Sequence, residues 1–122
     1  MLKVAGYSNG EIILSDKQVI SGSVILADDG KFFPINIGKN IEGFLNNENN
    51  YGFLDKFINK EIFLVGCGES FVIPSIKIRK LVHNKGLKLE WLTTKSSLDT
   101  FNLLMEDNRS FFALLINEIK SL

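Results

Sequence analysis

A chain of 122 residues, 45% of them hydrophobic, is long enough to bury a core without disulfide or metal cross-links. Its 14 basic and 14 acidic side chains balance, so it lacks the excess positive charge typical of nucleic-acid-binding proteins. The single cysteine excludes an internal disulfide and suits a reducing compartment, and we expect one domain over residues 1–122.

The first third of the chain is predicted to be β-structure. Short β-branched runs flank a turn-like Ser-Asp-Lys at 15–17, and Asp28-Asp29-Gly30 is a second turn signal. Pro34 has no N–H to donate to a strand ladder, so its strand should lie at a sheet edge or begin there. The expected strands span residues 11–14, 18–27 and 31–37.

The middle of the chain has weaker signals. Residues 38–50 are polar and rich in asparagine, and we expect them to form a flexible loop. A short helix is predicted over 51–58, because apolar residues recur there at helical spacing, although Gly52 weakens the prediction.

Strands and helices alternate in the second half. The unbroken apolar run 62–65 is typical of a strand covered on both faces, and residues 87–92 alternate as another strand. The helix predicted between them has Pro74 in its first turn and Gly86 in the left-handed position after its end. This strand–helix–strand unit should be a right-handed parallel crossover.

The remaining residues add one helix and one strand. The helix should begin at Thr93 or Thr94, either of which can cap it, and Asn108 should take the left-handed position at its end. Residues 111–116 then form a buried strand. Alternating strands and helices after a β-rich start indicate an α/β layered fold built on a mixed sheet.

The loop Gly66-Cys67-Gly68 follows a buried strand and precedes a helix. Backbone N–H groups in such a loop can bind an anion, and open α/β sheets place ligands beyond the carboxyl ends of their strands. The signal is weak, because Phe71 stands where a dinucleotide fingerprint has its third glycine and no P-loop Lys-Ser pair follows. The interpretation that we favour is a tight turn that needs both glycines.

No set of residues predicts catalysis or metal binding. Cys67 needs a base to act as a nucleophile, and the only histidine, His83, lies near the far end of the following helix. One cysteine and one histidine are too few for a zinc site, and the acidic residues show no spacing that brings two together. We therefore predict no catalytic residue, no metal, no cofactor and no enzymatic activity.

Asn102 is the most informative polar residue of the last helix. It lies one helical turn from Leu98 and from Met105, at the edge of the buried stripe, where an amide must find hydrogen-bond partners. One interpretation is that it ties the helix to a neighbouring loop such as the Gly66–Gly68 turn, and the other is that it lines a pocket there. The candidate pocket or structural motif consists of Gly66, Gly68, Thr94, Thr100 and Asn102.

A cluster of basic residues follows the glycine loop: Lys77, Arg79, Lys80, Lys85 and Lys88. We interpret this cluster mainly as the solvated face of one helix and its exit. A partner-binding patch is the alternative.

Over nearly its full length the chain resembles the domain-of-unknown-function family that includes mitochondrial NADH:ubiquinone oxidoreductase complex assembly factor 3 and the adipogenesis-associated domain proteins. The resemblance depends on a Gly-Ser-Val strand at 22–24, Pro34, the strand before Gly66 and Gly68, and a helix ending in Gly86. The family's C-terminal pattern is matched by Glu90, Leu92, Thr94, Thr100, Phe101, Asn102, Leu104, Asp107, Asn108 and Arg109. The chain departs from the family at Ile35, where a tryptophan is usual, so a function that requires that tryptophan is in doubt.

The resemblance implies a single three-layer α/β domain with a mixed central sheet and an N-terminal β-hairpin region, and no established enzymatic activity. It also implies a protein-interaction domain that assists the assembly or biogenesis of a membrane complex such as respiratory complex I, with a membrane-complex subunit as its partner. The alternative function is a small-molecule or anion-binding domain, or a cryptic enzyme, that uses the Gly66–Gly68 loop. Homo-oligomerisation through an edge of the N-terminal strands is a further expectation.

The sequence shows no signal-peptide run near Met1, and no stretch approaches about 18 apolar residues. We therefore expect no direct membrane insertion. The expected location is the cytoplasm, or an organelle matrix if the protein is eukaryotic.

Overall fold

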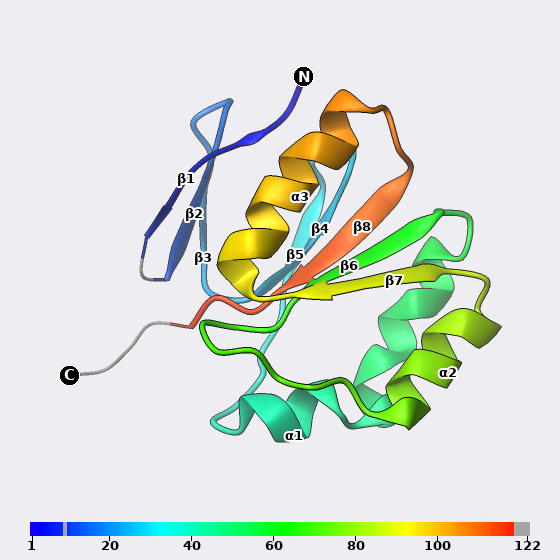
Figure 1. The fold of residues 1–122 in the computed structure, drawn as a ribbon. Coiled ribbons are helices and arrows are strands. Elements are labelled where there is room, and N and C mark those ends of the chain that lie inside the picture. Colours follow the sequence, from blue (N-terminus) through cyan, green and yellow to red (C-terminus); the bar gives the residue numbers. More distant parts are fainter. Residues whose placement is uncertain (9, 119–122) are drawn as a thin grey trace.

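The structure is a computed structural model that describes residues 1–8 and 10–118. Strands β1 to β5 come first, two short helices follow, and strands and helices alternate from β6 onward (Figure 1). In order, the elements are β1 (Val4–Ser8), β2 (Glu11–Leu14), β3 (Val19–Ser21), β4 (Val24–Ala27), β5 (Phe32–Pro34), α1 (Ile41–Leu45), the 3-10 helix η1 (Glu48–Phe57), β6 (Ile62–Gly66), α2 (Ile76–Asn84), β7 (Lys88–Leu92), α3 (Thr94–Glu106) and β8 (Phe111–Leu115).

The central sheet has five strands in the order β5-β4-β8-β6-β7 and is mixed. β4 runs antiparallel to β5 and β8, whereas β6 runs parallel to both β8 and β7. A separate antiparallel sheet has the order β1-β2-β3. The predicted parallel pairing of β6 and β7 around α2 is confirmed.

The side chains of the central sheet divide into two cores, because successive residues of a strand point to opposite faces. Phe63 and Val65 of β6 pack with α2, α1 and η1 on one face. Ile62 and Leu64 pack on the other face with α3 and with the apolar side of the small sheet. The predicted α/β fold is confirmed, and its three layers are a helical layer, the central sheet, and α3 beside the small sheet (Figure 1).

Stacked aromatic rings attach the helical layer to the sheet. The ring of Phe112 on β8 stacks on Phe63, with 4.7 Å between the ring centroids, and on Phe57 of η1, at 4.3 Å. Tyr51 lies in the same layer, and its hydroxyl donates a 2.5 Å hydrogen bond to the carbonyl oxygen of Leu45. Burial raises the pKa of Tyr51, so this hydroxyl stays neutral and keeps its donor.

Several boundaries differ from the predicted ones. The run 18–27 is two strands in two different sheets, because Gly22 adopts a φ of 76° and turns the chain between them. Pro34 does lie at a sheet edge, as predicted. The prediction for Pro74 is wrong, because Pro74 lies before α2 and not in its first turn. Ser75 is the N-cap, and its Oγ accepts from the Ile78 N–H at 3.3 Å.

The segment 38–50, which was expected to be a loop, contains α1 and the beginning of η1. Its asparagines explain the error, since they act as helix caps. Asn40 Oδ1 accepts from the Gly43 N–H at 2.9 Å, and Asn47 Oδ1 accepts from the Asn49 N–H at 3.0 Å. The helix predicted over 51–58 therefore begins earlier, and it is a 3-10 helix.

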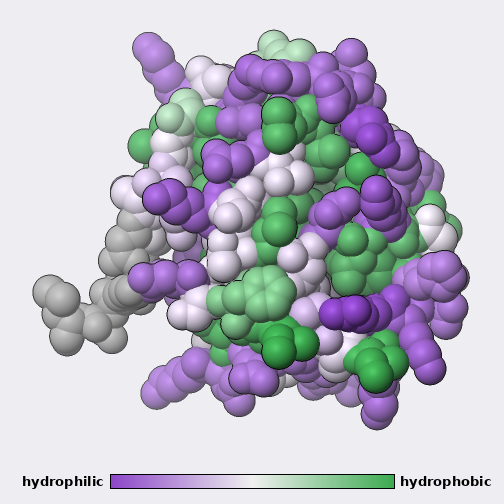
Figure 2. Space-filling view, in the orientation of Figure 1, coloured by the Kyte–Doolittle hydropathy of each residue, from purple (hydrophilic) through white to green (hydrophobic). Residues whose placement is uncertain are grey.

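The two edge strands of the central sheet are β5 and β7. β7 and α2 lie on the side of the molecule that faces the viewer in Figure 1. On this side, groups of hydrophobic side chains are bordered by hydrophilic ones (Figure 2). Within the described part of the chain, no helix is both long enough and apolar enough to cross a membrane.

We predict that Phe112→Ala lowers the free energy of unfolding by about 3–5 kcal/mol, because it removes the ring that joins the helical layer to the sheet. Phe32→Ala serves as the control, since Phe32 on the edge strand β5 is 38% exposed, and it should change stability by less than about 1 kcal/mol. Urea denaturation measures both variants. Equal losses in the two variants would contradict the assigned role of Phe112.

Candidate functional site

Thr94 is the hydrogen-bonding centre of the glycine turn. Its Oγ1 accepts from the Gly68 N–H at 2.9 Å and donates to the Ile116 carbonyl oxygen at 2.6 Å. Its own N–H donates to the Gly68 carbonyl oxygen at 2.9 Å. Thr94 is fully buried, so these bonds join the segment after β6, the segment after β8 and the beginning of α3 in a dry environment.

Gly66 allows the close approach of α3 to the end of β6. A Cβ at this position would overlap Ser97 Oγ and would lie 2.9 Å from the Thr94 Cα. Gly68 adopts a φ of 111°, in the region that favours glycine. Both glycines are therefore required by local packing and backbone conformation.

The N–H groups of this turn are used by the protein itself. The Cys67 N–H donates to the Leu92 carbonyl oxygen at 2.7 Å, and the Gly68 N–H donates to Thr94. An anion at the turn would have to displace these bonds. The geometry thus supports a structural turn more than an anion-binding loop.

We predict that Gly66→Ala destabilises the protein by about 1–3 kcal/mol, because the new methyl group must push apart α3 and β6. Gly52→Ala is the matched control: no atom lies within 4 Å of the added Cβ, so its effect should be within about 1 kcal/mol of zero. Thermal and urea denaturation give the comparison. An unchanged stability of Gly66→Ala would show that the turn can relax freely.

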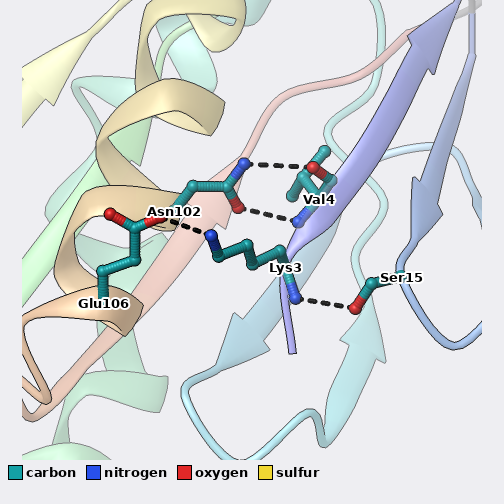
Figure 3. Close-up of polar contacts among 5 residues, drawn as sticks. All are labelled: Lys3, Val4, Ser15, Asn102 and Glu106. Carbon is teal, nitrogen blue, oxygen red and sulfur yellow. Dashed lines mark hydrogen bonds and ion pairs between the residues drawn. The ribbon is translucent and has the colours of Figure 1, made fainter. Parts of the chain in front are cut away.

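Asn102 lies elsewhere and pairs with β1 (Figure 3). Its Oδ1 accepts from the Val4 N–H at 2.8 Å, and its Nδ2 donates to the Val4 carbonyl oxygen at 3.0 Å. The side-chain amide of Asn102 thus forms the same pair of hydrogen bonds with Val4 that a neighbouring strand would form. It thereby connects α3 to the small sheet. An ion pair between Lys3 and Glu106 lies beside it.

Of the five candidate residues, Gly66, Gly68 and Thr94 come together, whereas Asn102 does not join them. The prediction that Asn102 contacts the Gly66–Gly68 turn is wrong, because the Asn102 amide pairs with the backbone of Val4. Thr100 is half-buried on α3. The sequence carried no signal for the pairing with Val4, because it joins residues 98 positions apart.

We predict that Asn102→Ala lowers the free energy of unfolding by about 1–3 kcal/mol, since it leaves the N–H and the carbonyl oxygen of Val4 without this partner. Leu103→Ala on the same helix is the control, because Leu103 is 60% exposed. Amide hydrogen exchange should accelerate in β1 of the Asn102 variant. Unchanged exchange there would contradict the assigned role.

Cys67 and His83 do not form the arrangement of a nucleophile and its base. Cys67 is fully buried in the core beneath the helical layer, and its Sγ accepts from the Val72 N–H at 3.3 Å. His83 lies in the last turn of α2 and faces a surface depression. In residues 1–8 and 10–118, no three His, Cys, Asp or Glu side chains are grouped as metal ligands would be.

That depression, which the sequence reasoning missed, measures about 440 Å³ and lies beside β7. The indole Nε1 of Trp91 donates to the Val72 carbonyl oxygen at 2.7 Å and so fixes one wall. Its lining comes from α2, from β7 with the residue before it, and from the segment before α2: Phe71, Pro74, Arg79, His83, Leu87, Lys88, Leu89 and Trp91.

Large apolar side chains next to the depression are exposed. The exposed fractions are 56% for Phe71, 72% for Ile73 and 70% for Ile76. Ile76 carried a sequence signal, because its helical spacing places it with the charged residues Arg79 and Lys80 and not with the buried Ile78. We call Phe71, Ile73, Ile76 and the depression together the β7-edge surface.

The fold and this geometry define a class, a three-layer α/β protein with a structural glycine turn and an open edge surface. The family described as "Protein of unknown function (DUF498/DUF598)" matches residues 4–116, and the chain belongs to that family. The predicted membership of a domain-of-unknown-function family is confirmed.

Solved structures of similar fold come from several bacteria. A protein from Bartonella henselae, described as an outer membrane protein, has a TM-score of 0.77 and 22% identity, with 94% of this chain and 93% of that chain covered. A Xanthomonas campestris protein has a TM-score of 0.75 and 20% identity, with 100% and 89% covered. A Bordetella pertussis protein described as a Mth938-like domain has a TM-score of 0.68 and 20% identity, with 98% and 88% covered. At these identities the likeness shows the fold alone.

A curated relative is the "13 kDa major membrane protein" of Francisella tularensis subsp. holarctica. It is 29% identical over 58 residues, which are 48% of this chain and 47% of that protein. The match therefore spans about half the length of the relative.

Proposed function

We propose that the protein is a non-catalytic protein-interaction domain and that the β7-edge surface is where its partner binds. The observation that carries the proposal is the exposure of Phe71, Ile73 and Ile76 beside the depression. Contiguous exposed apolar surface is typical of interaction sites in globular proteins. Burial of each such side chain against a partner contributes about 1.5–3 kcal/mol.

The fold buries less than half of each of these three residues. Ile76 begins α2, whose buried side is formed by Ile78 and Val82, so it points away from the core. Phe71 and Ile73 lie in the segment between the glycine turn and α2. A partner that covers all three gains hydrophobic free energy without any rearrangement of the core.

The non-catalytic part of the proposal is supported by the chemistry of the glycine turn. Its N–H donors and the Thr94 hydroxyl are already bonded within the protein, and the Cys67 thiol is buried. These groups hold the fold together and leave none of their polar atoms for a substrate.

The finer part of the proposal is a role in assembly or biogenesis of a membrane complex, such as a respiratory complex, through binding to one of its subunits. It is supported by the family resemblance and by relatives described as a major membrane protein and an outer membrane protein. We place the protein in the cytoplasm, or in an organelle matrix if it is eukaryotic.

We predict that a tagged chain retains specific proteins from native extract and that the triple variant Phe71→Ser, Ile73→Ser, Ile76→Ser loses them. Leu103→Ser, which removes an exposed apolar residue from α3, should retain the same proteins. Quantitative mass spectrometry after co-purification measures both. Both variants should melt close to the wild type, because the substituted side chains are exposed.

Two outcomes would contradict the proposed surface. Retention of the same partners by the triple variant would place binding elsewhere on the molecule. Recovery of no protein above background by the wild type would count against an interaction function as a whole.

A further inference from the structure

We propose that the partner binds as an extended acidic segment that adds a strand to the free edge of β7. The inference builds on the proposed function and names the chemistry of the partner. Three features of the described residues carry it: an open backbone edge, an apolar lining beside that edge, and a one-sided distribution of charge.

The backbone of β7 has one bonded side and one open side. The Lys88 N–H donates to Glu61 at 3.0 Å, and the Leu92 carbonyl oxygen accepts from Cys67, so both residues face β6. Hydrogen-bonding direction alternates along a strand, which turns the N–H and carbonyl groups of Leu89 and Trp91 outward. β7 ends the strand order of the described sheet, so these groups are available to an added strand.

The apolar lining lies beside this open edge. Leu87, Leu89 and Trp91 share one face of β7 and contribute to the depression, together with Phe71 and Pro74. Every second side chain of an added strand would fall on this face. The best segment therefore has apolar residues among the alternate positions that face the depression.

The ionisable side chains that line the depression itself are all basic. Residues 70–89 contain Lys77, Arg79, Lys80, Lys85 and Lys88 and no carboxylate, although the whole chain has 14 acidic residues. Arg79, His83 and Lys88 line the depression itself.

Ion pairs within the protein neutralise only part of this charge. Lys85 pairs with Asp55 at 2.5 Å, and Lys88 pairs with Glu90 at 3.5 Å on the surface. Among the described residues, no ion pair involves Lys77, Arg79 or Lys80. Acidic residues on the side of the partner that faces the depression, placed among its apolar residues, would complement these cations and speed its association.

A second copy of the chain fits this surface poorly, because pairing of two β7 edges would bring the two basic rims together. The other free edge of the central sheet is also less suitable. β5 has only three residues, and its Pro34 supplies no donor. These comparisons favour β7 and a partner of opposite charge.

The test uses a synthetic peptide of about eight residues with both ends blocked, in which the alternate positions that face the depression carry Val, Phe and Glu and the positions between them carry Thr. Trp91 is the only tryptophan and lines the depression, so its fluorescence reports binding to the full chain. We expect saturable binding that weakens by about tenfold when Lys replaces Glu in the peptide. N-methylation of the amides on the edge of the peptide that faces β7 should weaken binding as strongly, since it removes the ladder donors.

Charge reversal in the protein provides the matched pair. Arg79→Glu should weaken peptide binding by about tenfold, and Lys95→Glu on α3, away from the depression, should leave it unchanged. On binding, amide hydrogen exchange should slow at Leu89 and Trp91. Circular dichroism and melting temperature show that both variants are folded.

The outcomes separate this inference from the proposed function. Absence of peptide binding, equal binding of the Lys peptide, or full binding of the N-methylated peptide overturns strand addition by an acidic segment. If the triple variant still loses its cellular partners in that case, the interaction surface stands and only the mode of binding is wrong. Concentration-dependent self-association that slows amide hydrogen exchange at Leu89 and Trp91 would instead assign the edge to a second copy.

Discussion

The hydrogen bonds of Thr94 hold together parts of the chain that are far apart in the sequence. Its hydroxyl joins Gly68, which follows β6, to Ile116, which follows β8, while the residue itself begins α3 directly after β7. Buried polar groups that lose such partners cost about 1–3 kcal/mol each. The arrangement is possible only because Gly66 has no side chain, so the parallel half of the sheet depends on this one close contact.

This interaction also limits where the proposed partner could bind. Open α/β sheets commonly bind ligands beyond the carboxyl ends of their parallel strands, where loop N–H groups are free. Here the corresponding N–H groups of Cys67 and Gly68 are bonded to Leu92 and Thr94. The opposite face is covered by α3 and the small sheet, which Asn102 fastens to each other. The open edge at β7 is the part of the parallel sheet that remains accessible.

Sequence patterns correctly predicted the elements whose structure depends mainly on neighbouring residues. The buried run of β6, the pairing of β6 with β7, and the left-handed residues Gly86 and Asn108 were all found where the sequence placed them. The predictions for residues 38–50 and 18–27 were wrong because the local sequence there is compatible with more than one structure. Asparagine is common in loops and equally common as a helix cap, and Gly22 interrupts a run that is continuous in hydrophobicity.

The candidate site was less predictable than the fold. Gly66, Gly68 and Thr94 are in contact because the parallel pairing of β6 with β7 sets Gly66 opposite Leu92, two residues before Thr94. The partner of Asn102 is in β1, and no local pattern connects the two. The depression is assembled from separate segments around α2 and β7, so its apolar lining does not show a period in the sequence.

The net charge is balanced, but its distribution is not, because residues 70–89 next to the edge strand carry basic side chains and no acidic ones. An exposed edge is a hazard because any other strand can pair with it, and charged side chains are a common protection. On β7, the charged Lys88 and Glu90 alternate with Leu89 and Trp91. The neighbouring helix α2 contains basic residues but no acidic residue. Two copies of such a rim repel each other, whereas an acidic strand is attracted. In the proposed mode of binding, the charges that discourage self-association would therefore also select an acidic partner.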